Sequence, residues 1–187
     1  VVASGTGGFI TTLSAVDSLA LARDRFYARG RFADVFASVK RAPDALAETL
    51  RRTPGVADVQ TTTEMLVRIT LPGTSDPIIG QLIGVDRRHP ARMNRLTLRS
   101  GRAEDLSMSP GPVQADGAIP AWISETFAMA HGLKPGSRLQ ALVNGRQRSL
   151  VMAGVALSPE YIFAGLFGMP DQRGFGVFWV DAEVMAA

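Results

Sequence analysis

Apolar side chains recur at helical spacing through the first thirty residues. Four of them fall on one face of a helix: Phe9, Leu13, Val16 and Ala20. The pattern predicts a helix over about residues 8–27, and a cluster of arginines begins at Arg23. Two interpretations stay open, an amphipathic helix that docks on the domain or the outer end of a transmembrane helix. In the second, the helix continues as a juxtamembrane stalk with its arginines at the lipid headgroups. Such arginines usually stay cytoplasmic, but the rule weakens for long translocated domains.

The pattern from residue 32 to residue 85 predicts a strand, a helix and two further strands. The predicted elements are a strand at 32–40, a helix from Pro43 that ends at 53–55, a strand over 56–71, a turn at 72–77 and a returning strand at 78–85. Proline at the first helical position and alternating apolar residues in the strands carry these assignments. The result is one strand–helix–strand unit with an antiparallel hairpin.

A second unit of the same kind follows a loop rich in proline and glycine at 107–117. It contains a strand at 119–122, a helix capped by Ser124 and ended by Gly132, a strand at 139–143, an Asn144-Gly145 hairpin, a strand at 150–155 and a last strand at 175–180. Two such units predict an α+β fold. We expect a stalk helix at 1–30 and an α+β domain at 31–187. The domain has candidate sub-lobes at 31–90 with 150–187, and at 91–149.

Composition adds limits on the class of protein. The 187 residues are 46% hydrophobic and 20% charged, an ordinary globular balance for one domain or two small lobes. The absence of cysteine excludes disulfides and thiolate sites. With 20 basic and 17 acidic residues the net charge is +3, too small and scattered for a nucleic-acid partner. No run reaches the roughly 18 apolar residues of a membrane span. The chain starts at Val1 and stops at Ala187, and we interpret it as a domain cut from a larger protein.

The sequence contains no complete motif for catalysis, phosphate binding or metal binding. The glycine-rich segment at 4–8 lacks the Gly-Lys-Ser/Thr ending of a phosphate loop. His89 and His131 have no second ligand at metal-binding spacing, and no Gly-x-Ser-x-Gly elbow is present. We therefore expect no catalytic residue, no cofactor and no metal, and predict that the chain is not an enzyme.

A cluster of apolar residues follows Ser158-Pro159, in a segment that prolines and glycines keep from forming a long regular element. Its members are Tyr161, Phe163, Leu166, Phe167 and Met169. Exposed, these side chains would form a contact for a partner or cargo. The alternative is that they pack across the interface between the sub-lobes.

The sequence around this cluster resembles the extracytoplasmic domain of the FtsX-like, MacB-type permease subunits of ABC transporters. The resemblance is carried by Leu157-Ser158-Pro159-Glu160-Tyr161 and by Pro170-Asp171-Gln172-Arg173-Gly174-Phe175-Gly176-Val177. Shorter matches follow the family in order, at residues 13–27, 31–43, 54–56, 94–102, 124–128, 133–136 and 144–146. The residues singled out as family motif are Ser158, Pro159, Glu160, Pro170, Asp171, Phe175 and Gly176.

The resemblance implies an inner-membrane permease with this domain in the periplasm of a bacterium. It implies a separate cytoplasmic ATPase, a homodimer, and a lipoprotein, lipid or peptide as cargo, or a periplasmic partner that receives ATP-driven motion. The family's domain continues past the position of Ala187. The rival hypothesis is a soluble α+β small-molecule-binding protein or enzyme with the same layout.

Overall fold

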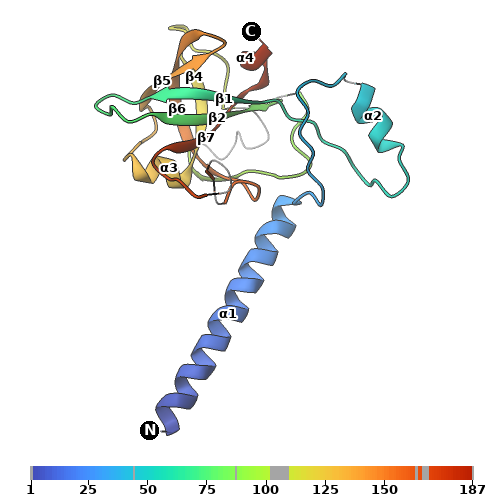
Figure 1. Cartoon of the computed structure of the whole chain (residues 1–187), viewed down its shortest axis with the longest axis vertical. Helices are drawn as coiled ribbons and strands as arrows, with labels where there is room; N and C mark the ends of the chain where they lie inside the picture. Colours follow the sequence, from blue (N-terminus) through green and yellow to red (C-terminus); the bar gives the residue numbers. More distant parts are fainter. Residues whose placement is uncertain are drawn as a thin grey trace.

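The chain forms a long helix joined to a compact body. The computed structural model describes residues 2–43, 45–86, 88–101, 110–162, 164–165 and 169–186, with side chains described between 14 and 185. Helix α1 (Val2–Gly30) has 29 residues and is about 43 Å long at about 1.5 Å per residue. It projects away from the body, with the N-terminus at its far end (Figure 1). Among the described residues, no helix combines the length and apolarity needed to cross a membrane.

The body is a single mixed sheet with short helices at its margins. Its strands are β1 (Glu64–Thr70), β2 (Ile78–Val85), β3 (Thr97–Ser100), β4 (Ile119–Ser124), β5 (Arg138–Val143), β6 (Arg146–Leu157) and β7 (Phe175–Asp181). Its helices are α2 (Ala45–Arg51), α3 (Glu125–Ala130) and α4 (Ala182–Ala186). The α+β class is therefore confirmed, and strands from both predicted sub-lobes belong to the one sheet.

The sheet closes on itself through its longest strand. Its order is β3-β6-β4-β7-β2-β1-β5, and β5 pairs a second time with β6. Strand β6 has 12 residues, and it pairs with β5 along its first half and with β3 near its end, while β4 lies along its other side. The β2–β7 and β4–β6 pairs are parallel and the others antiparallel. Closure leaves few free strand edges.

The central strands are covered on both faces, so they carry apolar residues at nearly every position rather than at alternate ones. All seven residues of β7 are buried. On one face the ring of Phe127 from α3 lies 5.4 Å from that of Phe178, edge to face. On the other face Trp122 and Trp179 form a second cluster, against which Tyr161 packs. The segment after β6 therefore covers part of this second face.

Several predicted elements are confirmed. The helix predicted at 8–27 lies within α1, and the strand predicted at 78–85 is β2. The hairpin is made by Asn144 and Gly145, whose φ angles of 49° and 75° suit the left-handed turn that such a pair favours. The last predicted strand is β7, which extends by one residue to Asp181.

Other expectations are wrong. Residues 32–40 form no strand, and their side chains from Asp34 to Lys40 are exposed. They pair with no strand of the sheet, and a strand-like composition does not form a strand without such a partner. The predicted strand in 56–71 is confined to β1. Strand β3 and helix α4 were not predicted. Ser124 precedes α3 without a capping bond, because its hydroxyl oxygen accepts instead from the backbone N–H of Val177 at 3.2 Å.

Candidate functional site

The end of α1 is fixed by a complete helix-terminating motif. Arg31 has φ of 49°, in the left-handed region. Its N–H donates to the carbonyl of Ala28 at 3.2 Å, and the N–H of Phe32 donates to the carbonyl of Tyr27 at 3.1 Å. The rings of Tyr27 and Phe32 stack at 4.8 Å. This is the Schellman arrangement with its apolar contact, and it sets the direction in which the chain leaves the helix.

Gly30 is the point at which α1 touches the body. The glycine is buried, and a Cβ placed on it would lie 3.0 Å from the Cγ of Pro159 and 3.6 Å from the carbonyl oxygen of Arg95. Its own carbonyl accepts from the N–H of Arg95 at 2.8 Å. The lack of a side chain at position 30 therefore allows the helix end to approach two loops of the body closely. We call this contact region the joint: residues 30–33, 94–95 and 158–161.

Asn94 ties the two sides of the joint together. Its Oδ1 accepts from the N–H of Ala33 at 3.0 Å, and its Nδ2 donates to Oε2 of Glu160 at 3.2 Å. Its own N–H donates to the carbonyl of Arg31 at 3.1 Å. Asn94 has φ of 49°, a conformation that asparagine tolerates better than most residues. One side chain thus links the chain leaving α1 to the segment after β6.

The Ser158-Pro159-Glu160-Tyr161 motif is a turn that supplies the body's half of the joint. Ser158 is buried, and its Oγ accepts from the N–H of Glu160 at 3.2 Å while its carbonyl accepts from the N–H of Tyr161 at 3.3 Å. These bonds place Pro159 against the helix end and Glu160 against Asn94. The motif residues that looked most informative in the sequence therefore meet the stalk helix.

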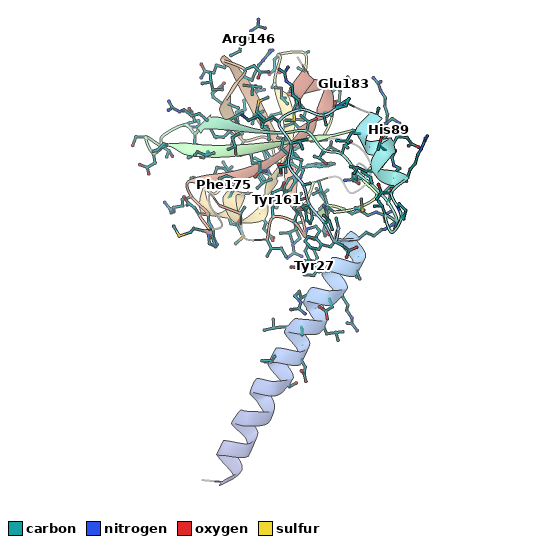
Figure 2. All side chains as sticks on the ribbon, turned by 45° about the vertical axis from the view of Figure 1, so that its right-hand side comes forward. Tyr27, His89, Arg146, Tyr161, Phe175 and Glu183 are labelled. Carbon is teal, nitrogen blue, oxygen red and sulfur yellow. The ribbon has the colours of Figure 1, made fainter. Side chains whose placement is uncertain are left out.

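Tyr161 connects the joint to the sheet. Its hydroxyl donates to Oε1 of Glu64 on β1 at 2.9 Å, and Gln81 of β2 donates to Oε2 of the same carboxylate at 2.8 Å. The Tyr161 ring lies 6.2 Å from that of Trp179 on β7, nearly perpendicular to it. Tyr161 lies close to the end of α1 that carries Tyr27 (Figure 2). Nε2 of Gln81 also lies 3.4 Å from the Tyr161 hydroxyl oxygen, so this one residue of the motif contacts β1, β2 and β7.

Burial shifts the acid–base behaviour of this region. Desolvation, followed by the nearby negative charge of Glu64, raises the pKa of Glu160 above its usual value. Desolvation, followed by the carboxylates of Glu160 and Glu64, raises the pKa of the Tyr161 hydroxyl. Tyr161 therefore keeps its proton and remains a hydrogen-bond donor at neutral pH.

The second motif, at 170–176, builds the turn into β7 and its packing. Oδ1 of Asp171 accepts from the N–H groups of Arg173 at 3.1 Å and Gly174 at 2.8 Å, which closes the turn before β7. A Cβ on Gly176 would lie 2.8 Å from ring atoms of Phe127 and Phe178. Pro170 is exposed beside the turn, and Phe175 is buried in the second cluster. The residues of the second motif therefore shape the turn and pack the core.

The predicted apolar cluster is only partly visible. Tyr161 is half-buried in the joint, and Met169 is 74% exposed. Phe163, Leu166 and Phe167 lie outside the described residues. A contact with cargo or a partner at this cluster stays a prediction.

Groups able to hold a metal are not gathered within the described part of the chain. No set of three or more histidine, aspartate or glutamate side chains comes together there. His131 ends α3, where its Nε2 lies 2.9 Å from the carbonyl oxygen of Arg173, and His89 pairs with Asp86 at 2.9 Å. Both histidines thus have local structural partners.

Sequence reasoning missed the residues that the joint recruits from a distance. Asn94 falls within the segment 94–102 that resembles the family, and Glu64 and Gln81 fall within predicted strands, so none of the three stands out in the sequence. Glu64 and Tyr161 are 97 positions apart, so no local pattern connects them. Gly30 at the end of an arginine-rich helix was the one signal available, since glycine often follows a helix.

Comparison with known proteins gives distant structural likenesses. No family model and no curated protein matches the sequence. The structure is similar to the extracellular domain of the noncanonic ABC-type transporter YknZ from Gram-positive bacteria, with 15% identity, a TM-score of 0.43, and coverage of 76% of this chain and 63% of that one. It is also similar to the periplasmic region of MacB from Actinobacillus actinomycetemcomitans, with 15% identity, a TM-score of 0.39, and coverage of 77% and 56%.

A third likeness is to a domain of a protein described as a permease from Porphyromonas gingivalis, with 17% identity, a TM-score of 0.40, and coverage of 66% of this chain and 45% of that one. The first of these structures is an extracellular domain, the second a periplasmic region and the third a domain of a permease. The chain spans between 45% and 63% of the length of these structures. At these TM-scores the likeness is too distant to decide what the chain does.

Proposed function

We propose that the chain is the extracytoplasmic domain of an ABC transporter permease subunit, located in the periplasm on an inner-membrane parent. In this proposal α1 is the juxtamembrane stalk, and the body passes the motion of the stalk to a cargo or partner. The parent works with a cytoplasmic ATPase subunit as a homodimer, and moves a lipoprotein, lipid or peptide or acts on a periplasmic partner. The domain itself holds no catalytic residue or cofactor.

The observation that carries this proposal is the joint. The family motif at 158–161 contacts the end of α1 through Pro159 and reaches the sheet through Tyr161. A long helix can transmit a tilt only if its end is held, and Gly30 is held by backbone bonding to Arg95 and by close packing. Movement of α1 would therefore reach β1 and β2 through hydrogen bonds and β7 through ring packing, as hinge-type coupling requires. The proposed contact for cargo or a partner is the cluster of Tyr161, Phe163, Leu166, Phe167 and Met169, which begins in the joint at Tyr161 and continues after it in the sequence.

The location of the domain tests the proposal, and the lack of cysteine makes the test clean. Ser100, at the exposed end of β3, is changed to cysteine in the full-length parent after removal of any other cysteines. A membrane-impermeant maleimide is then applied to intact cells. We expect labelling without lysis. The matched control is Ala121→Cys, at a fully buried position that should be labelled only after denaturation.

Labelling of the Ser100→Cys variant only after lysis would contradict the proposal. It would place the domain in the cytoplasm and favour the rival hypothesis, a soluble small-molecule-binding protein or enzyme. Labelling of the Ala121→Cys control in intact cells would instead indicate that this variant is not folded, and the control would be repeated at another buried position.

A further inference from the structure

An arm of the chain projects from the body between α1 and β1, at residues 32–63. Helix α2 and the segment before it lie on the same side of the body, away from the sheet (Figure 1). No residue of α2 is buried. The segment 34–40 has a strand-like sequence, yet Val35 is 82% exposed and Val39 is 65% exposed. Residues with strong β-propensity are thus displayed without a partner.

The arm is held at both ends by the same short segment of the body. Near its start, the N–H of Ala33 donates to Asn94. Near its end, Oε1 of Gln60 accepts from the N–H groups of Arg92 at 2.8 Å and Met93 at 3.0 Å. Between these ends, and within the described ranges, residues 34–42 make no backbone hydrogen bond. The arm is therefore fixed in position while its middle keeps free donors and acceptors, which is the condition for pairing with another strand.

We propose that residues 34–40 form an antiparallel strand pair with the same residues of a second copy of this chain, centred on Ala37. A two-fold symmetric pair must be self-complementary, because the same patch serves both copies. In the register centred on Ala37, Asp34 faces Lys40 of the second copy, and Lys40 faces its Asp34. Val35 faces Val39 in the same way.

The charge pattern favours this register and a second copy as the occupant. Asp34 and Lys40 are both exposed, and neither takes part in an ion pair within the part of the chain that the structure describes. The dimer would therefore gain two cross-strand pairs of opposite charge. Because strand side chains alternate, Val35, Ala37 and Val39 would share one face, and opposed valines would cover each other across the pair.

Sedimentation velocity over a concentration series tests the proposal with the whole 187-residue chain. We expect a reversible dimer. Asp34→Lys places two lysines opposite each other, and Lys40→Asp places two aspartates opposite each other. Each variant should weaken dimerisation about tenfold, since cross-strand charges at both ends of the pair change from attractive to repulsive. The double variant Asp34→Lys/Lys40→Asp should regain dimerisation.

Mixing the two single variants gives the sharpest result. A copy with lysine at both positions complements a copy with aspartate at both, so the mixture should form a heterodimer more tightly than either variant dimerises alone. Asp76→Lys is the matched control: Asp76 is exposed and lies in a turn of the body, and its change alters net charge as Asp34→Lys does. It should leave dimerisation unchanged.

A chain that stays monomeric at all concentrations would overturn the proposal. So would a dimer that survives both single variants, or one that Asp76→Lys weakens as much as Asp34→Lys does. The outcome does not depend on the proposed function, because it measures self-association in solution, whereas the labelling experiment measures the location of the domain in cells.

Discussion

Asn94 offers a way to separate the backbone strain in the joint from its side-chain bonding. The perturbation is a pair of variants, Asn94→Gly and Asn94→Ala. Both remove the bonds to Ala33 and Glu160, which leaves a partly buried donor and a partly buried carboxylate without these partners. Each lost bond contributes about 0.5–1.5 kcal/mol, so the glycine variant should lower the free energy of unfolding by about 1–3 kcal/mol.

The alanine variant carries an additional cost. At φ of 49° alanine is strained, whereas glycine is not. We therefore expect Asn94→Ala to be less stable than Asn94→Gly by about 1 kcal/mol. Urea titrations followed by the fluorescence of the buried Trp122 and Trp179 measure both differences. Hydrogen exchange at the amide of Ala33 gives a local readout, and its protection should fall in both variants.

Two results would refute the reasoning. If Asn94→Gly is as stable as the original chain and Ala33 keeps its protection, the side-chain bonds do not hold the joint. If the glycine and alanine variants have equal stability, position 94 does not adopt the left-handed conformation in solution. A control at Asn144, also with φ of 49° but in an exposed hairpin, should show the alanine–glycine difference without the loss of side-chain bonds within the joint.

Three further predictions follow from the geometry. Arg31→Gly should raise the free energy of unfolding by about 0.5–1 kcal/mol, because glycine adopts a φ of 49° without strain; a less stable variant in thermal denaturation would contradict this. Gly176→Ala should lower it by about 1–3 kcal/mol, because the added Cβ would lie 2.8 Å from the rings of Phe127 and Phe178; urea denaturation tests this, and unchanged stability would argue against that close packing. Since the pKa of Glu160 is raised above 4.5, its contribution to stability is fully present below about pH 4.5 and is lost as pH rises through the folded-state pKa. Glu160→Gln should therefore gain stability relative to the original chain between pH 4 and pH 7.5, and an equal difference at both pH values in urea titrations would contradict the raised pKa.

Patterns in the sequence predicted those elements whose conformation is determined by residues close together in the chain. The alternation in β1 and the Asn144-Gly145 turn depend on neighbouring residues, and both are confirmed. The segment 32–40 has the composition of a strand, but a strand forms only where it pairs with a neighbour, and the order in which segments pair is a property of the whole chain. The pattern at 32–40 therefore predicted a strand that the single chain does not form.

Of the residues that form the joint, only the motif at 158–161 could be singled out from the sequence. The motif at 158–161 stood out by its resemblance to a family, and it lies at the joint. Its counterparts did not stand out, because Asn94 and Glu64 acquire their roles from contacts across 66 and 97 positions. Such contacts depend on how the strands are ordered in the sheet, which periodicity does not reveal.

The joint also has a consequence for the order of events during synthesis. Gly30 is made well before Arg95 and Pro159, the residues against which it packs. Contacts between such distant positions form late, since loop closure must precede them. The packing of Gly30 against Pro159 can therefore form only after most of the body has been translated. A chain truncated before residue 159 would lack Pro159 and Glu160, so only the bonds from Asn94 and Arg95 would hold the end of α1.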